Sequence, residues 1–386
     1  MSRHPLRVLQ LIDSLAPSGA ERSLASLAPY LRKEGIDVHL AYLVERNGLR
    51  EDVEAAGIPV HSLANGKADR RRWLSRTIQL IDEVRPAVVH TTLFEADLAG
   101  RRAAARAGVP CASSLVNTAY GGVEMRRDSV NPLRAAAARA ADVFTARKVE
   151  RFHAITQHVA AVMAQRLLVP ERKVEVIHRG RDPRQLGRRS PERRSETRRR
   201  LGVPEEAPLI LAVGRQEPQK GLEVLLRAVP SVLEQHPDAR VLVAGRPGRA
   251  TPSLTELVHA SSLADTVSFL GRRNDVPDLL ASADVLAFPS LWEGAAGTVL
   301  EAMALECPLV ATRLPPLLEA VEESTAELVT PGDSTDLAQG LLAVLGDRAA
   351  AAERARAARS TFKRKFTIDI SAQRMADFYH RVAAAM

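Results

Sequence analysis

The stretch VLAFPSLWEGAAGTVLEAMALECPLVAT, residues 285–312, contains one complete strand–helix–strand unit. Val285–Phe288 and Pro308–Ala311 are short apolar runs, which are typical of strands buried on both faces of a sheet. Pro289 ends the first run, and the apolar spacing over Gly297–Leu305 predicts a helix. Because strands joined by a helical crossover lie parallel, this stretch predicts an α/β fold with a parallel sheet.

The same alternation extends along the chain in both directions, with one interruption. Before the interruption, the expected strands are Arg7–Asp13, Val38–Leu43, Val60–Leu63, Ala87–Thr92 and Pro110–Leu115, and the expected helices are Arg22–Lys33, Trp73–Val84 and Asp97–Ala107. After it, the expected strands are Pro208–Val213, Arg240–Ala244, Thr266–Leu270, Val285–Phe288, Pro308–Ala311 and Glu327–Val329. The expected helices there are Gly221–Glu234, Pro252–Ser261, Val276–Ser282, Gly297–Leu305, Asp336–Leu345, Ala349–Lys363 and Ile368–Ala384. This order predicts two doubly wound domains.

The interruption at 179–204 is rich in Arg, Pro and Ser and poor in large apolar residues, so it predicts a domain boundary. We expect an N-terminal, acceptor-binding Rossmann-like domain over 1–180 and a basic linker over 181–205. A C-terminal, nucleotide-sugar-binding Rossmann-like domain is expected over 206–365. The terminal segment, 366–386, is expected to be a helix that crosses back onto the first domain.

Length and composition indicate a folded protein of two domains. The chain has 386 residues, of which 46% are hydrophobic and 26% charged, the mix of an ordinary globular protein. Cys111 and Cys307 lie far apart without metal-ligand spacing, so neither a disulfide framework nor a zinc site is expected. The start runs into a strand without a leader, and no stretch is apolar over the length of a membrane span. We therefore expect a cytoplasmic protein.

The positive charge is concentrated in one segment. The formal net charge is +8, and residues 179–200 hold ten arginines against three acidic residues. The rest of the chain is nearly neutral and has few aromatic residues on which bases could stack, so no nucleic acid is expected as a partner. The basic segment fits two interpretations, a site for anionic lipid headgroups or a phosphorylated substrate, and a solvated linker.

A loop that leads into a helix follows the strand ending at Phe288. Glu293 and Gly294 lie in the loop, and the helix is expected to begin near Gly297. The free N–H groups and the positive end of that helix suit a diphosphate or sugar hydroxyls. Glu301, one turn into the helix, has the chemistry to accept hydrogen bonds from a ribose diol. The plainer interpretation makes Glu301 an exposed helix residue and Glu293 an acid stabilised by the helix dipole.

Two other loops also join a strand to a helix. Arg215 and Lys220 lie five positions apart in one of them, so both cations can converge on a diphosphate, although an ordinary basic turn has the same composition. Gly19 lies in the other and allows a close approach of the backbone to a ligand. The chain contains neither G-x-G-x-x-G nor G-x-x-x-x-G-K-[ST], which argues against a dehydrogenase or an ATPase.

Together these loops resemble the retaining family-four glycosyltransferases of the GT-B fold, and the resemblance covers most of the chain. The most specific mark is the Glu-x7-Glu motif, from Glu293 to Glu301, followed by Ala-Met. The next is Val213-Gly214-Arg215 with Lys220-Gly221, and weaker matches lie at 19–22, 85–91, 176–182 and 331–333. The resemblance implies two Rossmann-like domains that face each other across a cleft.

The resemblance also implies roles for individual residues. Arg215 and Lys220 would hold the donor diphosphate and, with Glu293, form the catalytic group, while Glu301 would bind the ribose. The other implied donor-binding residues are Gly19, Gly271, Arg272, Gly294, Ala295, Ala296, Gly297, Thr298 and Val299. The expected acceptor-binding residues are Asn117, Thr118 and Tyr120. No metal and no other cofactor is expected, because fixed cations and helix ends would do the work of a magnesium ion.

The sequence departs from the family pattern in three places. Val116 stands where many members carry a His after the fifth strand, so a protonatable side chain is missing there. Ala295 and Ala296 replace a common Phe-Gly pair, and residues 313–316 read Arg-Leu-Pro-Pro where Gly-Gly is frequent. Without a nucleophile at Val116, we expect front-face attack, in which the departing phosphate oxygen takes the proton of the acceptor.

The sequence therefore predicts a retaining, metal-independent hexosyltransferase that moves a sugar from a UDP- or GDP-sugar to a hydroxyl group. The acceptor is expected to be a glycan, a lipid-linked molecule or a small molecule, as in polysaccharide biosynthesis. Segments Gly121–Arg134 and Asp69–Trp73 are expected to meet it, with peripheral contact to the inner face of an anionic membrane. The alternatives are a nucleotide-sugar hydrolase or phosphorylase of the same fold and an inactive nucleotide-sugar-binding protein.

Overall fold

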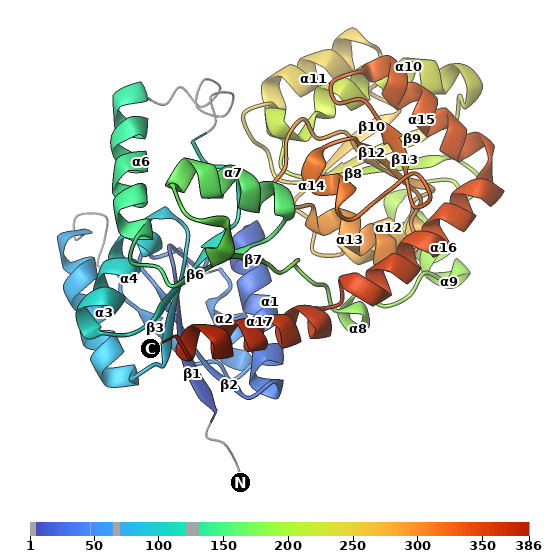
Figure 1. Cartoon of the computed structure of the whole chain (residues 1–386). Helices are drawn as coiled ribbons and strands as arrows, with labels where there is room; N and C mark the ends of the chain where they lie inside the picture. The colour runs from blue at the N-terminus through green and yellow to red at the C-terminus, as the bar shows by residue number, and fades with distance from the viewer. Residues whose placement is uncertain (1–4, 47, 65–69, 121–130, 386) are drawn as a thin grey trace. The chain divides into compact units, whose positions relative to one another are not determined.

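The computed structural model describes residues 5–46, 48–64, 70–120 and 131–385, which fold into two compact units (Figure 1). Unit 1 contains the chain up to Gly180 together with the segment from Ile368 onward, and unit 2 is Arg181–Thr367. Each unit contains a parallel sheet with helices packed on it, so the prediction of two Rossmann-like domains is confirmed.

Unit 1 has, in the residues described, a seven-stranded sheet with the order β3-β2-β1-β4-β5-β6-β7. Its strands are β1 (Leu6–Ile12), β2 (Ile36–Tyr42), β3 (Val60–Ser62), β4 (Val88–Thr92), β5 (Cys111–Leu115), β6 (Arg151–Ala154) and β7 (Val174–Val176). Its helices are α1 (Gly19–Lys33), α2 (Arg50–Ala55), α3 (Arg70–Val84), α4 (Phe94–Ala107), α6 (Pro132–Ala146), α7 (Gln157–Leu167) and α17 (Ile368–Ala383). The strand order reverses between β1 and β4, the arrangement of a doubly wound sheet.

Unit 2 has, in the same described part of the chain, a six-stranded sheet with the order β10-β9-β8-β11-β12-β13. Its strands are β8 (Leu209–Val213), β9 (Arg240–Ala244), β10 (Val267–Gly271), β11 (Val285–Phe288), β12 (Leu309–Thr312) and β13 (Glu327–Val329). Its helices are α8 (Pro183–Leu186), α9 (Pro191–Leu201), α10 (Leu222–Gln235), α11 (Thr251–Ala260), α12 (Val276–Ser282), α13 (Gly297–Ala304), α14 (Pro315–Leu318), α15 (Ser334–Gly346) and α16 (Arg348–Lys365). Here the order reverses between β8 and β11.

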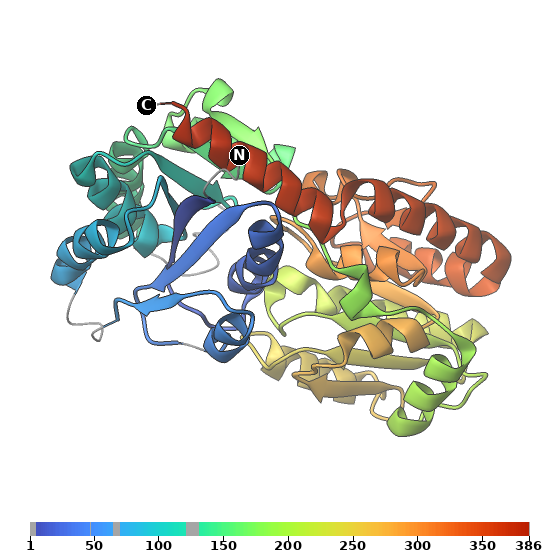
Figure 2. The same ribbon diagram turned by 90° about the horizontal axis from the view of Figure 1, so that it is seen from below.

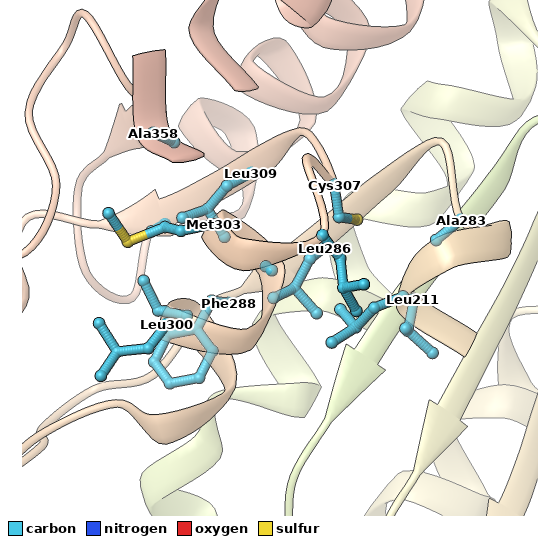
Figure 3. Packing of buried hydrophobic residues seen from close by; sticks show 14 of the residues in the cluster. Leu211, Ala283, Leu286, Phe288, Leu300, Met303, Cys307, Leu309 and Ala358 are labelled. Atoms are coloured by element: carbon cyan, nitrogen blue, oxygen red, sulfur yellow. The ribbon is translucent and has the colours of Figure 1, made fainter. Parts of the chain in front are cut away.

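Burial of apolar side chains explains why residues 285–312 fold as strand, helix and strand. Leu286 and Phe288 of β11, Met303 of α13 and Leu309 of β12 belong to one buried cluster (Figure 3). Burying a side chain of this kind stabilises the fold by about 1.5–3 kcal/mol. Because α13 has only eight residues, it depends on this packing rather than on its own helix propensity.

The last helix belongs to unit 1, as expected from the sequence. Phe378, Tyr379 and Val382 of α17 lie in one apolar cluster with Val8 of β1 and Val88 of β4. In Figure 2, α17 is the dark red helix that lies alongside the strands of unit 1. Unit 1 is therefore built from two stretches of chain that are separated by all of unit 2.

The arginine-rich segment is folded into unit 2 and contains helices α8 and α9, whereas the sequence suggests a linker. Arg198 is completely buried and donates a hydrogen bond of 2.6 Å to Asp284. Arg193 pairs with Asp278 at 2.7 Å, and Arg189 donates to two backbone carbonyl oxygens. These arginines thus stabilise unit 2. Neither interpretation of the basic segment, an anion-binding site or a solvated linker, includes this structural role.

Candidate functional site

The carboxyl edge of the unit 2 sheet carries the loops that the sequence singles out. The chain proceeds from β8 to β9 and β10 on one side, and β11 lies on the other side of β8. In open α/β sheets, a reversal of this kind leaves a crevice at the carboxyl ends of the strands, and ligands bind there. Residues 214–221 follow β8 and residues 289–296 follow β11, so both loops lie at this point.

Backbone contacts join the two loops. The Leu291 N–H donates to the carbonyl oxygen of Gln219, and the Gln219 side chain donates to the carbonyl oxygen of Trp292, both at 2.8 Å. Gly221 has a φ of +61°, and a Cβ atom there would overlap the carbonyl oxygen of Pro289. Only glycine fits a position that is both left-handed and so close to another backbone segment.

Lys220 and Glu293, one from each loop, form a buried ion pair at this junction. Lys220 Nζ donates to Glu293 Oε1, and Ser290 Oγ donates to the same oxygen at 2.9 Å. Lys220 Nζ also lies 5.4 Å from the centre of the Phe288 ring. The Glu293 side chain is only 5% exposed, whereas that of Lys220 is 20% exposed. An ammonium group has three donors, so Lys220 can hold Glu293 and still bind an anion at the edge of the sheet.

Arg215 lies on the same loop but is directed differently. Its side chain is half-exposed, and its Nη1 lies 3.8 Å from Glu217 Oε1. The neighbouring Gln216 is buried and fixes the loop, because its side chain accepts a hydrogen bond of 2.7 Å from Thr251 Oγ1. The structure thus brings Lys220 and Glu293 together and places Arg215 on the same loop, with its guanidinium nearer the surface.

The first residue of unit 2, Arg181, contacts the start of α13. Arg181 Nε donates to Glu301 Oε1 at 2.8 Å, and a Cβ atom on Gly297 would overlap Arg181 Nη2. Both side chains of the pair are about one-fifth exposed. The N-cap residue of α13 is Ala296, which has no side-chain acceptor for the first N–H groups of the helix. These N–H groups and Arg181 give the start of α13 a positive potential.

The other expected donor-binding residues differ in accessibility. Gly294, Ala295, Ala296 and Thr298 are half-buried around the start of α13, whereas the Val299 side chain lies fully in the apolar core. Val299 can therefore offer only its backbone to a ligand. Gly271 ends β10 with a φ of +64°, and Arg272 follows it with an exposed side chain.

In unit 1, the expected glycine and the position after β5 also lie at the carboxyl ends of strands. Gly19 is the first residue of α1, and its carbonyl oxygen accepts hydrogen bonds from Ser23 Oγ and from Arg179 Nη1. Val116 directly follows β5 and is half-buried. Val116 and Arg179 line the same pocket of unit 1.

The expected acceptor-binding residues form a turn that unit 1 holds in place. Asn117 is exposed, and its side chain accepts a hydrogen bond from the Ala119 N–H. Arg166 donates to the carbonyl oxygen of Thr118. The Tyr120 hydroxyl donates to Asp142 at 2.7 Å, and burial together with this carboxylate raises its pKa. The hydroxyl of Tyr120 therefore anchors the turn. Of the two segments expected to meet the acceptor, 121–130 and residue 69 lie outside the described residues.

Three residues of interest carry no clear signal in the sequence. Arg181 contacts Glu301 across 120 positions, and Ser290 joins the Lys220 pair only because the loop folds back. Asp13 follows β1 and accepts a hydrogen bond from the Ala96 N–H at 2.8 Å. Burial raises the pKa of Asp13 to about 7, so this carboxyl titrates near neutral pH. Each of these properties depends on a contact between distant parts of the chain.

In the described residues, no three His, Cys, Asp or Glu side chains are grouped so that they could hold a metal ion. None of the described helices has the length and apolar character needed to cross a bilayer.

Both units match known families. The model of the family described as "Glycosyl transferases group 1" matches residues 207–347. The model described as "Glycosyltransferase Family 4" matches residues 17–185. An uncharacterised glycosyltransferase of Methanocaldococcus jannaschii is 36% identical over 46% of this chain and 46% of its own length. A D-inositol 3-phosphate glycosyltransferase of Corynebacterium kroppenstedtii is 33% identical over 53% of this chain and 48% of its own. The chain thus spans about half the length of these curated relatives.

Among solved structures, the Anabaena protein Alr3699/HepE in complex with UDP and glucose has a TM-score of 0.85. The likeness covers 97% of this chain and 100% of that one, at 23% sequence identity. A similarity of this extent shows that the two chains share a fold.

Proposed function

Because the chain belongs to the group 1 glycosyltransferase family, we propose that it transfers a sugar from a nucleoside diphosphate sugar to a hydroxyl acceptor. One observation carries the proposal: the Lys220–Glu293 pair lies at the reversal point of the unit 2 sheet, where the loop after β11 leads into α13. A cation and a helix N-terminus at this edge suit a diphosphate. The buried carboxylate and the neighbouring loop suit the hydroxyls of a donor sugar.

The donor is proposed to be a UDP- or GDP-sugar. The Anabaena neighbour is described in complexes with UDP and with UDP-glucose, and a Corynebacterium glutamicum relative is named as GDP-mannose-dependent. A panel of nucleoside diphosphates added to the protein would separate the two, because a ligand that binds only the folded state raises its stability by RT ln(1 + [L]/Kd). The nucleotide with the largest shift in melting temperature identifies the base.

The reaction is proposed to proceed with retention by front-face attack and without a metal ion. The bond from the anomeric carbon to the β-phosphate oxygen breaks, and the acceptor oxygen bonds to that carbon on the same face. The departing phosphate oxygen takes the proton of the acceptor. Lys220, Arg215 and the start of α13 would stabilise the charge that develops on this oxygen. Val116 supports the scheme, because an aliphatic side chain after β5 cannot act as a nucleophile.

The proposal is tested by incubating the protein with donor sugars, with and without acceptors. Release of free nucleotide that requires an acceptor indicates a transferase, and release without one indicates a hydrolase. Binding without release indicates an inactive binding protein. The configuration of the anomeric carbon in the product, read from its NMR coupling constant, distinguishes retention from inversion. Activity that survives dialysis against EDTA supports the metal-independent scheme, and activity restored only by added Mg²⁺ contradicts it.

Replacing the proposed diphosphate ligands should lower turnover while the fold persists. Lys220→Ala and Arg215→Ala are each expected to reduce kcat about 10²–10³-fold, the usual loss when one stabilising donor is removed. Arg199→Ala is the matched control, because the Arg199 side chain is 77% exposed on α9. Turnover like that of the wild type in both Lys220→Ala and Arg215→Ala would remove these residues from the mechanism.

A lipid-linked acceptor at an anionic membrane is supported by one face of unit 1. Leu133, Phe144 and Leu168 are exposed by 81%, 62% and 71%. Phe144 and Leu168 line one shallow apolar depression together with Arg139 and Arg147. Apolar side chains flanked by cations are typical of helices that lie on a bilayer surface. The basic residues proposed for membrane contact are thus Arg139 of α6 and Arg147, which directly follows this helix, rather than those of the 179–200 segment.

Vesicle binding tests this membrane face. The protein should co-sediment with vesicles that contain phosphatidylglycerol, and Phe144→Ser with Leu168→Ser should abolish the binding. Pure phosphatidylcholine vesicles are the control for charge. Equal binding of the double variant and the wild type would place any membrane contact elsewhere.

A further inference from the structure

A row of buried polar side chains crosses the face of the unit 1 sheet that α17 covers. Gln10, His90, Ser114 and His153 come from β1, β4, β5 and β6, and Tyr379 comes from α17. None of the five is more than 8% exposed. Buried polar groups are nearly always hydrogen-bonded, so the partners of each atom in this row can be traced.

A carbonyl group at one end of the row determines which atom donates in each hydrogen bond along it. His153 Nε2 lies 3.0 Å from the carbonyl oxygen of Ile177, which can only accept, so this nitrogen carries the proton. Burial lowers the pKa of His153 to about 4 and that of His90 to about 3, so each ring is neutral and has one N–H. The Nδ1 atom of His153 therefore accepts from Ser114 Oγ, at 3.0 Å. Ser114 Oγ in turn accepts from His90 Nε2, at 2.8 Å.

The other end of the row fixes the amide of Gln10. His90 Nδ1 must accept, and it does so from the Tyr379 hydroxyl at 2.7 Å. The oxygen of Tyr379 accepts from Gln10 Nε2 at 2.8 Å. The amide nitrogen of Gln10 is therefore committed to Tyr379, and its Oε1 points elsewhere. Within the described residues, Gln10 Oε1 is buried and has no hydrogen-bond partner.

Gln10 lines a pocket of about 60 Å³ that lies wholly within unit 1. The apolar part of its wall includes Leu24 and Leu27 of α1 together with Ile368 and Met375 of α17, and His178 and Arg179 also line the pocket. A buried acceptor without a donor, beside apolar walls, is complementary to a molecule that has one donor and an aliphatic body. This pocket is lined by residues of unit 1, whereas the donor site proposed above uses residues of unit 2.

We propose that the unit 1 pocket binds a small neutral molecule whose hydroxyl group donates to Gln10 Oε1 and whose aliphatic part packs against Leu27, Ile368 and Met375. A carboxylate could pair with Arg179, which also lines the pocket, but beside Gln10 its oxygens would face another acceptor. An ammonium group does not fit either, because the row beside it consists of neutral groups and offers no counter-charge. An alcohol satisfies both the acceptor and the apolar walls.

The test compares two isomers that differ in the donor alone, 1-butanol and 1-methoxypropane. The protein is labelled with ¹³C at the methionine methyl groups, and each compound is titrated. Met375 reports on the pocket, and Met163, which is buried in α7 and does not line the pocket, is the internal control. 1-Butanol should shift the Met375 signal in a saturable way and bind about tenfold more tightly than the ether, the usual value of one hydrogen bond.

Two variants connect this preference to Gln10. Gln10→Leu removes the acceptor, so the two isomers should bind equally to it. Ser114→Ala breaks the row between the two histidines but leaves Gln10 Oε1 in place, so it should retain the preference for the alcohol. If Gln10→Leu does not fold, the comparison of the two isomers on the wild-type protein still tests the proposal. Equal affinity of the isomers for the wild type, or a Met375 signal that neither compound shifts, would overturn the proposal and leave water as the occupant.

Discussion

At the scale of single residues, Arg181 shows how one side chain organises the start of a helix. Its guanidinium donates to Glu301 and fills the space above Gly297. The first position of α13 thus requires glycine because a side chain there would collide with Arg181, and not because of its backbone conformation. The pair is partly exposed, so it contributes little stability of its own, and its main effect is to orient Glu301.

The contact can be tested by a double-mutant cycle. Gly297→Ala should displace Arg181 and destabilise unit 2 by about 1 kcal/mol, whereas the same change in an Arg181→Ala background should cost almost nothing, because neighbouring substitutions are not additive. Trp292 lies in unit 2, so its fluorescence during urea unfolding in a Trp73→Phe background measures both values. An equal loss in the two backgrounds would show that Arg181 does not occupy this space.

The two buried histidines of unit 1 predict how its stability depends on pH. Burial holds the pKa of His90 at about 3, while in the unfolded chain the ring takes up a proton near pH 6.5. The unfolded state therefore binds more protons below pH 6.5, and stability falls as the pH is lowered from 6.5 toward 4. Each such histidine contributes a slope of about 1.4 kcal/mol per pH unit.

His90→Gln should remove one of these slopes. Between pH 6 and 4.5, the free energy of unfolding of the variant should fall by about 1.4 kcal/mol less per pH unit than that of the wild type. Asp13, whose pKa burial raises to about 7, acts with the opposite sign, but it is present in both proteins and cancels in the comparison. Urea unfolding followed at Trp73, in a Trp292→Phe background, gives the two slopes. Identical slopes would mean that His90 is already charged in the folded state.

At the scale of elements, helix α9 is tied to unit 2 by an arginine. Arg198 donates to the carbonyl oxygens of Pro204, Glu205 and Ala207 and to Asp284. The adjacent Arg199 is exposed and pairs with Glu196 of the same helix. Sequence composition cannot distinguish Arg198 from Arg199. The two differ in burial and in hydrogen-bond partners, which depend on how the rest of unit 2 packs around them.

These adjacent arginines form a matched pair of variants. Arg198→Ala should destabilise unit 2 by about 3–5 kcal/mol, because Asp284 would keep its charge in the interior with one partner fewer. Arg199→Ala should change stability by less than about 0.5 kcal/mol, as is usual for exposed positions. Thermal unfolding followed at Trp292 gives both values, and a similar small effect of the two substitutions would contradict the role of Arg198.

The elements that could be predicted are those with strong local patterns. The strands of the unit 2 sheet are apolar over nearly their whole length, and each was expected close to its observed bounds. The segment that forms β6, α7 and β7 received no prediction. Strand β6 begins with Arg151, and β7 has only three residues, Val174–Val176. Such short strands form because a neighbouring strand pairs with them, and a local pattern cannot show that.

At the scale of the whole chain, the candidate site could be predicted only where residues share a sheet edge. The family resemblance places Lys220 and Glu293 in one group, and the structure brings them into contact because each follows a strand of the same sheet. The Arg181–Glu301 pair and the row from Gln10 to His153 depend on contacts between segments that lie far apart in the sequence. Tyr379 in particular closes that row from the last helix.

Removal of α17 should therefore unfold unit 1 and spare unit 2. A chain that ends at Thr367 lacks Phe378, Tyr379 and Val382, each worth about 1.5–3 kcal/mol of burial, and uncovers His90. Trp73 emission should shift to the value of unfolded protein, while a cooperative transition at Trp292 persists. If both tryptophans kept their native emission, α17 would be dispensable for unit 1.

The division of unit 1 into two stretches has a consequence for how the protein is made. All of Arg181–Thr367 has been translated before the first residue of α17 leaves the ribosome. The second unit synthesised can thus complete its folding first, while the unit begun earlier waits with Gln10 and His90 uncovered. Nascent chains of this protein should need protection at the exposed side of their first sheet until translation reaches Tyr379.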